Sequence, residues 1–355
     1  MTRIAFYAPM KPPDHPTPSG DRRMARLLMQ ALEKAGYDTG VASELRSRDG
    51  VGNPDAQAAL IREAALELER LTAHWHNDPP ALWFTYHCYY KAPDLLGPAL
   101  ADHFGIPYVI AEASRARKRL TGPWAAFARR AESAIDRADL LLAMTEHDRS
   151  ALDRDARNGQ QIADFPPFID IGPVAVSKAQ SSTLRLLTVA MMRGPDKRAS
   201  YRRLATALRG LDSGAWCLTI VGDGPERAEV EAMFEAYGDQ VIFAGQISDE
   251  HRLQTYYAQS DVFVWPGVNE AYGMVYLEAQ AAGTAVVAED WPGPRSVIAP
   301  SSALVPKDDA RAFRDAIMRL SADPEAGRAA RRHVLNHHEI DGASARLKSL
   351  LGDLS

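Results

Sequence analysis

Two glutamates eight positions apart, Glu270 and Glu278, lie beside a turn where a ligand can bind. The apolar residues 262–265 before them predict a buried strand, and from about residue 271 the composition favours a helix that ends at Gly283. In a parallel sheet, such a turn lies at the carboxyl ends of the strands, where ligands bind. A solvated helix face is the alternative for Glu278. The apolar strands on both sides of this helix favour a covered, functional position instead.

The start of the same helix favours a negatively charged group. The first backbone N–H groups of a helix, here those of residues 272–275, have no partners within the helix. Together with the helix dipole they attract an anion. The turn therefore combines two carboxylates with an anion-binding helix end.

A second turn carries two cations beside a glycine. Residues 184–190 predict a strand and residues 199–211 a helix, and the loop between them contains Arg193, Gly194 and Lys197. Fixed positive charges next to a helix start suit a diphosphate. The alternative is a cationic surface loop.

The chain begins with a similar unit. Residues 3–8 predict a strand, residues 9–20 a loop rich in proline, and residues 21–35 a helix. This order of elements is typical of the first part of a dinucleotide-binding half-domain. Gly20 lets the backbone approach a ligand closely at this helix start. An ordinary turn glycine is an equally good interpretation.

Polar residues follow two later strands of this half. His87 and Glu112 end apolar runs, and a basic segment at residues 115–119 comes directly after, with Arg115 and Lys118 as its candidate ligand contacts. Such a run is usually a solvated surface. The sharper alternative is a site for an anionic acceptor or an acidic membrane face.

Composition restricts the class of protein. The 355 residues exceed the usual limit for one core and predict two domains. A net charge of −5 argues against a basic nucleic-acid binder. Cys88 and Cys217 lie in apolar runs and fit reduced thiols. With no leader-like or membrane-spanning apolar run, we expect a cytoplasmic protein, with peripheral membrane contact left open.

Strands alternate with helices through both halves, which predicts an α/β protein with parallel sheets. Pro166 and Pro167, followed by the polar residues 177–183, interrupt this alternation and mark a domain boundary. His333 and His337 have a spacing that could hold a metal, but no third ligand is evident and a surface position is expected.

The Glu-x7-Glu pattern, with Gly273 and the sequence Glu278-Ala-x-Ala-x-Gly283, resembles the retaining glycosyltransferases of family 4. Gly222-Asp-Gly-Pro225 matches a turn of that family as well. The resemblance is strong over residues 184–306 and weak before residue 165. It implies the GT-B fold, in which two Rossmann-like parallel-sheet domains face an interdomain cleft. Residues 1–167 would bind the acceptor, residues 168–333 the nucleotide-sugar, and residues 334–355 would cross back as a final helix.

The resemblance also implies residue roles. Glu278 would bind ribose, Glu270 the transferred sugar, and Arg193 with Lys197 the diphosphate. The wider donor site would include Gly20, Gly222, Gln246, Ile247, Ala271, Tyr272, Gly273, Met274 and Val275. The donor would be linked to UDP or GDP, and neither a cofactor nor a metal is expected. The acceptor would be a glycan, a lipid or a small molecule.

Three departures from the family pattern stand out. Arg198 replaces the glycine that usually follows the lysine, Trp291-Pro-Gly-Pro-Arg-Ser296 replaces a turn that contains a glutamate, and the histidine expected just after residue 112 is absent. His87 or Glu112 would fill that last polar role on the acceptor side. A GT-B sugar-nucleotide 2-epimerase and a non-catalytic GT-B partner module remain as alternative functions.

Overall fold

The computed structural model describes residues 2–17, 19–172, 181–211 and 216–354. The chain forms two compact units. The first comprises Met1–Phe168 and Ile340–Ser355, and the second comprises Ile169–Glu339. The functional division expected at residues 167 and 333 stays a prediction.

A six-stranded sheet with the order β2-β1-β3-β4-β5-β6 forms the centre of the first unit, and all of its pairings are parallel. Its strands are β1 (Arg3–Tyr7), β2 (Asp38–Ser43), β3 (Leu82–Cys88), β4 (Tyr108–Ala113), β5 (Leu140–Ala143) and β6 (Gln161–Asp164). The inner strands β3, β4 and β5 are almost wholly buried, as expected for a parallel sheet covered on both faces.

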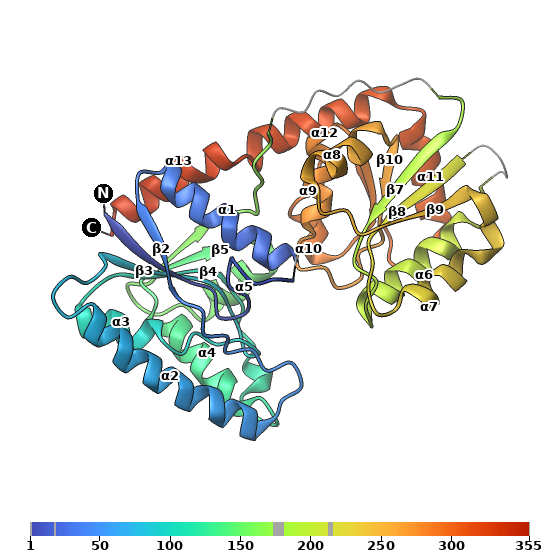
Figure 1. The fold of residues 1–355 in the computed structure, drawn as a ribbon. Coiled ribbons are helices and arrows are strands. Elements are labelled where there is room, and N and C mark those ends of the chain that lie inside the picture. The colour runs from blue at the N-terminus through green and yellow to red at the C-terminus, as the bar shows by residue number, and fades with distance from the viewer. Residues whose placement is uncertain (1, 18, 173–180, 212–215, 355) are drawn as a thin grey trace. The chain divides into compact units, whose positions relative to one another are not determined.

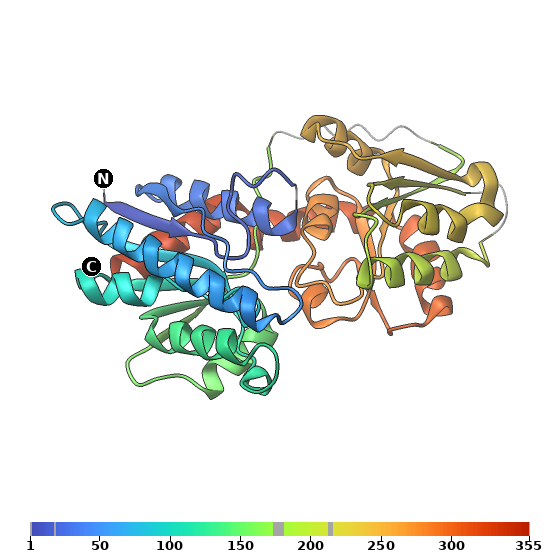
Figure 2. The same cartoon turned by 60° about the horizontal axis from the view of Figure 1, so that its bottom comes forward.

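Helices cover both faces of this sheet. They are α1 (Gly20–Lys34), α2 (Pro54–His74), α3 (Gly97–Phe104), α4 (Ala125–Arg137), α5 (Glu146–Arg154) and α13 (Ile340–Gly352), with a short 3-10 turn η1 (Arg117–Arg119). The helices α2, α3 and α4 pack together on one face, whereas α1 and α13 run side by side on the other (Figures 1 and 2). Burial of Met24, Leu28 and Leu32 shows that α1 buries one stripe, as its spacing of apolar residues predicts.

The second unit contains another parallel six-stranded sheet, with the order β12-β11-β10-β7-β8-β9. Its strands are β7 (Leu184–Val189), β8 (Trp216–Val221), β9 (Val241–Gly245), β10 (Val262–Val264), β11 (Ala285–Glu289) and β12 (Ala303–Val305). Its helical segments are α6 (Asp196–Leu208), α7 (Arg227–Phe234), η2 (Glu235–Gln240), α8 (Glu250–Gln259), α9 (Met274–Ala281), α10 (Pro292–Arg295), α11 (Ala310–Ser321) and α12 (Pro324–His337).

The expected α/β class with two parallel-sheet units is confirmed. The strand before the two glutamates, β10, is central in its sheet, since it lies between β7 and β11. Two helix starts differ from prediction. The helix expected from residue 271 begins at Met274. The helix expected from residue 199 begins at Asp196, so Lys197 lies in its first turn.

No helix in the described part of the chain is both long and apolar enough to cross a membrane. Cys88 and Cys217 are free thiols, as expected. Among the described residues, no group of three or more histidine, cysteine, aspartate or glutamate side chains has the arrangement of a metal site.

Candidate functional site

The turn after β10 brings Glu270 and Lys197 into direct contact, although 73 positions separate them in the sequence. The Lys197 ammonium forms an ion pair with Glu270 Oε1, and the indole N–H of Trp265 donates to the same oxygen at 2.9 Å. Lys197 Nζ also lies 5.5 Å from the centre of the Trp265 ring. The side chains of Glu270 and Lys197 are 14% and 21% exposed, so the pair is largely withdrawn from water but still reachable.

Two further contacts tie the start of α6 to this turn. The Asn269 amide donates to Asp196 Oδ1 at 3.0 Å, and the backbone N–H of Val268 donates to the hydroxyl of Ser200 at 2.9 Å. Lys197 lies between Asp196 and Ser200 on the first turn of α6. The two turns predicted separately from the sequence therefore form one local structure.

Gly273 provides the bend from which α9 begins. Its φ of +81° lies in the left-handed region, and a side chain there would place its Cβ 2.5 Å from the Tyr276 ring. Glycine at this position keeps the start of α9 open at the backbone. Ala271 is exposed, Val275 is half-buried, and Tyr272 and Met274 are buried. The ligand contacts predicted for these residues would therefore come most readily from their backbone groups.

Glu278 lies one turn inside α9 and is held from a neighbouring helix. The hydroxyl of Tyr257, on α8, donates to Glu278 Oε2 at 2.6 Å. The side chain thus points toward α8 and has a fixed acceptor oxygen. The sequence predicted Glu278 as a site residue but did not predict its partner Tyr257, because a tyrosine in an amphipathic helix is usually interpreted as a core residue.

The three cations at and before the start of α6 have different surroundings. Arg193 is exposed and, within the described part of the chain, its guanidinium makes no hydrogen bond or ion pair. Arg198, which replaces the expected glycine, forms ion pairs with Glu226 and Glu229 at 3.4 and 2.9 Å. Lys197 and not Arg198 is therefore the α6 cation joined to Glu270.

Gly222 has a structural reason to be glycine. With a φ of +145°, it packs so closely on the residue that follows β7 that a Cβ would lie 1.9 Å from the carbonyl oxygen of Ala190. Its N–H donates to the carbonyl of Gly245 at 2.9 Å. Gln246 and Ile247 follow that glycine, the first exposed and the second half-buried. The ligand roles of these residues stay predictions.

The first unit places its predicted polar residues at the carboxyl edge of its sheet. Gly20 is the first residue of α1, and Ser19 caps the helix by accepting from the N–H of Arg22 at 3.3 Å. His87 Nδ1 lies 3.1 Å from Asp21 Oδ1 and 3.8 Å from Glu112 Oε1. The structure thus brings the predicted His87 and Glu112 together and adds Asp21, which the sequence did not single out.

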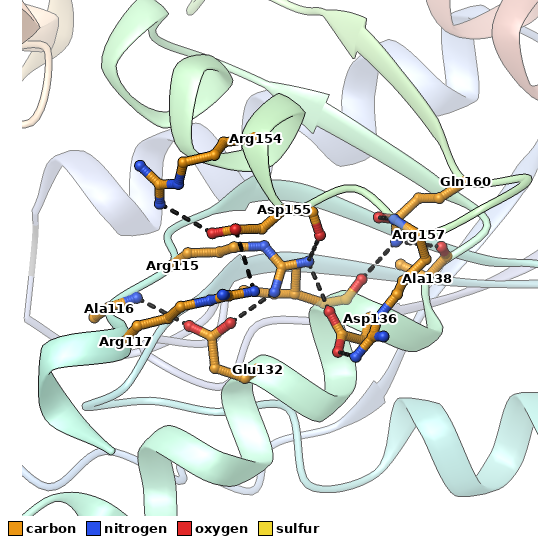
Figure 3. Close-up of polar contacts among 11 residues, drawn as sticks. Arg115, Ala116, Arg117, Glu132, Asp136, Ala138, Arg154, Asp155, Arg157 and Gln160 are labelled. Carbon is orange, nitrogen blue, oxygen red and sulfur yellow. Dashed lines mark hydrogen bonds and ion pairs between the residues drawn. The ribbon is translucent and has the colours of Figure 1, made fainter. Parts of the chain in front are cut away.

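Arg115 is not part of an exposed basic surface. Its side chain is 1% exposed and donates to Glu132 and Asp136 at 2.6 and 2.7 Å (Figure 3). It also donates to the backbone carbonyl of Asp155 at 3.3 Å. These acceptors lie on α4 and on the loop after α5, so Arg115 fixes the segment that follows β4. This residue has a structural role, contrary to its expected place on the ligand-facing surface.

The other basic residues of segment 115–119 differ in their exposure and in their contacts. Arg117 is more than half exposed and pairs with Asp155 at 3.2 Å. Arg119 lies 5.2 Å from the ring centres of both Tyr90 and Trp124, a cation–π arrangement. Lys118 is exposed. Of the two predicted contacts, Arg115 and Lys118, only Lys118 is placed to meet a partner at the surface.

Comparison with known proteins follows the same division of the chain. The family model described as glycosyl transferases group 1 matches residues 183–323, which lie in the second unit. A GDP-mannose-dependent alpha-(1-6)-phosphatidylinositol monomannoside mannosyltransferase of Mycolicibacterium smegmatis is 30% identical over 223 residues, covering 58% of this chain and 53% of that protein. A GDP-mannose-dependent alpha-mannosyltransferase of the same organism is 37% identical over 83 residues, covering 23% and 21%. The chain spans between about a fifth and about half of the length of these and other curated relatives.

Solved structures match over the whole chain at lower identity. A sucrose-phosphate synthase from Thermosynechococcus elongatus has a TM-score of 0.77 at 21% identity, covering 100% of this chain and 99% of that one. The trehalose-6-phosphate synthase OtsA has a TM-score of 0.74 at 14% identity, with 100% of both chains covered. At these identities the likeness concerns the fold alone. The chain therefore has the GT-B fold, and its second unit carries the sequence pattern of the group 1 glycosyl transferases.

Proposed function

We propose that the protein is a retaining glycosyltransferase that moves a sugar from a nucleotide-diphosphate sugar to an acceptor hydroxyl. The observation that carries this proposal is the contact between Lys197 and Glu270 beside the start of α9. It joins the cation that we assign to the diphosphate and the carboxylate that we assign to the sugar hydroxyls. That site lies inside the region that matches the group 1 glycosyl transferases.

The chemistry follows from the charge that develops in the reaction. As the bond to the sugar breaks, negative charge grows on the leaving diphosphate, and its stabilisation is the largest electrostatic task. Lys197, Arg193 and the N–H groups near Gly273 and Met274 supply this stabilisation. Glu270 accepts hydrogen bonds from the sugar and stabilises the positive charge on its ring. Glu278, held by Tyr257, accepts hydrogen bonds from the ribose.

The retaining outcome is assigned by the resemblance to family 4. Same-face attack assisted by the leaving phosphate requires no protein nucleophile, and Glu270 need not leave its contacts with Lys197 and Trp265 to form a covalent bond. The cations of the turn take the part that a metal plays in other transferases. We therefore expect turnover in the presence of a chelator.

GDP-mannose is our first candidate for the donor. The names of two curated relatives specify it, whereas a neighbouring structure of a protein named HepE holds UDP. Peripheral contact with an anionic membrane, through Lys118 and its neighbours, is part of the proposal because one relative acts on a phosphatidylinositol mannoside. Binding to anionic vesicles that weakens with salt would support this contact.

A panel of nucleotide-sugars tests the proposal. A ligand that binds only the folded state raises its midpoint of thermal unfolding, so the donor should stand out in a thermal-shift screen. Product analysis with that donor then separates three outcomes. Sugar transfer or slow donor hydrolysis supports the transferase, conversion to another nucleotide-sugar supports the epimerase, and no donor binding supports the non-catalytic module.

A further inference from the structure

One face of helix α6 is matched to the turn that carries Glu270. Residues three and four positions apart lie on the same side of a helix. Lys197, Ser200 and Tyr201 have this spacing in the first two turns of α6. Lys197 forms the ion pair with Glu270, and the Tyr201 ring packs on the Trp265 ring with their centres 4.9 Å apart. Ser200 lies between these two contacts and meets the turn through its hydroxyl.

The Ser200 hydroxyl joins α6 to the backbone of the turn. It accepts from the N–H of Val268 at 2.9 Å and donates to the carbonyl of Asp196, one helical turn back, at 3.0 Å. A hydroxyl suits this position because it can accept and donate at the same time. Ser200 is fully buried and Val268 is 8% exposed, so the contact is withdrawn from water. Among the residues that the structure describes, Ser200 supplies the only acceptor for the Val268 N–H.

A second hydrogen bond crosses between α6 and the turn nearer the surface. The amide of Asn269 donates to Asp196 Oδ1 at 3.0 Å. Asn269 is exposed, and a solvated hydrogen bond contributes little because water can replace either partner. Loss of the buried acceptor, in contrast, would leave the Val268 N–H with the full cost of its desolvation. Of the two contacts, the one through Ser200 therefore determines where the turn lies on α6.

Val268 and Glu270 belong to the same tight turn. The N–H of Glu270 donates to the carbonyl of Gly267 at 3.2 Å, which closes a β-turn with Val268 and Asn269 at its two central positions. Gly267 and Asn269 have φ values of +70° and +53°, both in the left-handed region. Because four residues closed by a hydrogen bond move together, the position of Val268 sets the position of Glu270.

We propose that Ser200 is a positioning residue that holds Glu270 where the Trp265 indole and the Lys197 ammonium reach the same carboxylate oxygen. The assignment rests on the proposed transferase function, in which Glu270 binds the transferred sugar. Ser200 acts through Val268 and, being fully buried, does not itself contact a donor. Loss of its hydroxyl should let the turn shift and misplace the carboxylate, while Lys197 remains available to a diphosphate.

The test is NMR of the full-length protein labelled with 15N-tryptophan, recorded without any nucleotide. The chain contains six tryptophans, and the Trp265 indole signal is assigned by its loss in Trp265→Phe. Because this indole N–H donates to Glu270 at 2.9 Å, its chemical shift reports the position of the carboxylate. Glu270→Gln provides the reference for a weakened contact.

Two variants change the hydroxyl and one serves as the matched control. Ser200→Ala removes the hydroxyl, and Ser200→Cys keeps nearly the same size but supplies a weaker acceptor. Thr206→Ala is the control, because the Thr206 hydroxyl donates to the carbonyl one turn back in the same helix at 3.0 Å but is exposed. The Cys variant decides the test if the Ala variant does not fold.

We expect Ser200→Ala to move the Trp265 signal in the same direction as Glu270→Gln does, and Ser200→Cys to move it less. The other five indole signals should keep their positions, and Thr206→Ala should change none of the six. The proposal is overturned if the Trp265 signal keeps its position in the Ser200 variants, if all six signals move together, or if Thr206→Ala moves the Trp265 signal equally.

Kinetics with the identified donor adds a second readout that a loss of overall stability would not give. Ser200→Ala should lower kcat about fivefold to a hundredfold, the range for a buried donor that loses its acceptor, and should bind free nucleotide as the wild type does. Lost nucleotide affinity with unchanged kcat would overturn the proposal. Because the NMR comparison needs neither donor nor turnover, its outcome is separate from success or failure of the transferase assay.

Discussion

The indole N–H of Trp265 and the ammonium of Lys197 share one oxygen of Glu270. In the proposed reaction, the diphosphate of the donor would compete with Glu270 for the Lys197 ammonium, because both are anions. The indole N–H is then the contact that holds the carboxylate in place. Trp265 is fully buried and has ring contacts with both Lys197 and Tyr201, so it cannot move away with the ligand.

Replacement of Trp265 by Phe keeps most of the ring and removes only the N–H donor. A hydrogen bond to a charged group contributes about 1.5–3 kcal/mol, so we expect kcat to fall about tenfold to a hundredfold. Affinity for free UDP or GDP should stay nearly unchanged, since the free nucleotide lacks the transferred sugar that Glu270 would hold. Trp291→Phe is the control, because that indole donates to Glu289 elsewhere in the same unit. Equal kcat in the Trp265 variant and the control would remove Trp265 from the site.

Lys197→Ala and Arg193→Ala should each weaken the binding of nucleotide diphosphates by about 1.5–3 kcal/mol, the range for hydrogen bonds to charged groups. Calorimetry with UDP and GDP measures this directly. Arg198→Ala is a suitable control, since that neighbouring cation is already engaged by Glu226 and Glu229. If the Arg198 variant lost affinity while the other two kept it, the diphosphate would have to be assigned to another surface of α6.

The stability of the protein should fall as the pH rises from about 7 to about 9. The pKa of His87 in the folded protein, about 9, is above its ordinary value of 6.5. Protonation of His87 therefore stabilises the folded state fully below pH 6.5, and this contribution is lost as the pH passes through 9. Glu112, with its pKa raised to about 7, acts in the same direction at lower pH. Urea unfolding at several pH values measures the effect, and His87→Gln should flatten the slope between pH 7 and 9. A wild-type slope of the opposite sign would contradict the charge arrangement.

Arg115→Ala should lower the free energy of unfolding by about 3 kcal/mol, because loss of one partner leaves carboxylates uncompensated in a largely buried network. Lys118→Ala, three positions along the same basic segment, should leave it unchanged within about 0.5 kcal/mol. Chemical denaturation of both variants provides the comparison. Equal stability in the two variants would mean that the Arg115 contacts contribute little.

The sequence predicted what depends on local pattern and could not predict what depends on distant partners. The alternation of apolar runs with amphipathic segments indicated both parallel sheets, and the turns at Lys197 and Glu270 were each recognised. Their ion pair was not predicted, because 73 positions separate the two side chains. Arg115 was assigned to the surface because its acceptors Glu132 and Asp136 come 17 and 21 positions later, on a helix that covers it.

Trp265 and Asp21 were missed for a related reason. A tryptophan in an apolar run reads as a core residue, and Trp265 is one. A buried indole N–H usually needs an acceptor, however, and a glutamate five positions later was a signal that could have been used. Asp21 resembled any acidic residue in the first turn of a helix. Only the sheet order, which places β1 beside β3, brings it to His87.

The two glutamates test the central claim most directly, because the proposal assigns Glu270 to the sugar and Glu278 to the nucleotide. Steady-state kinetics with the identified donor, together with calorimetry of the free nucleotide, compares Glu270→Gln with Glu278→Gln. Glu270→Gln should mainly lower kcat, since its contacts matter most as positive charge develops on the sugar, and it should bind free nucleotide as well as or better than the wild type because Lys197 loses its competing anion. Glu278→Gln should mainly raise the donor KM, because the ribose contact is the same in ground and transition states. Loss of nucleotide binding in Glu270→Gln with normal binding in Glu278→Gln would reverse the two roles, and full turnover in both variants would contradict the transferase itself.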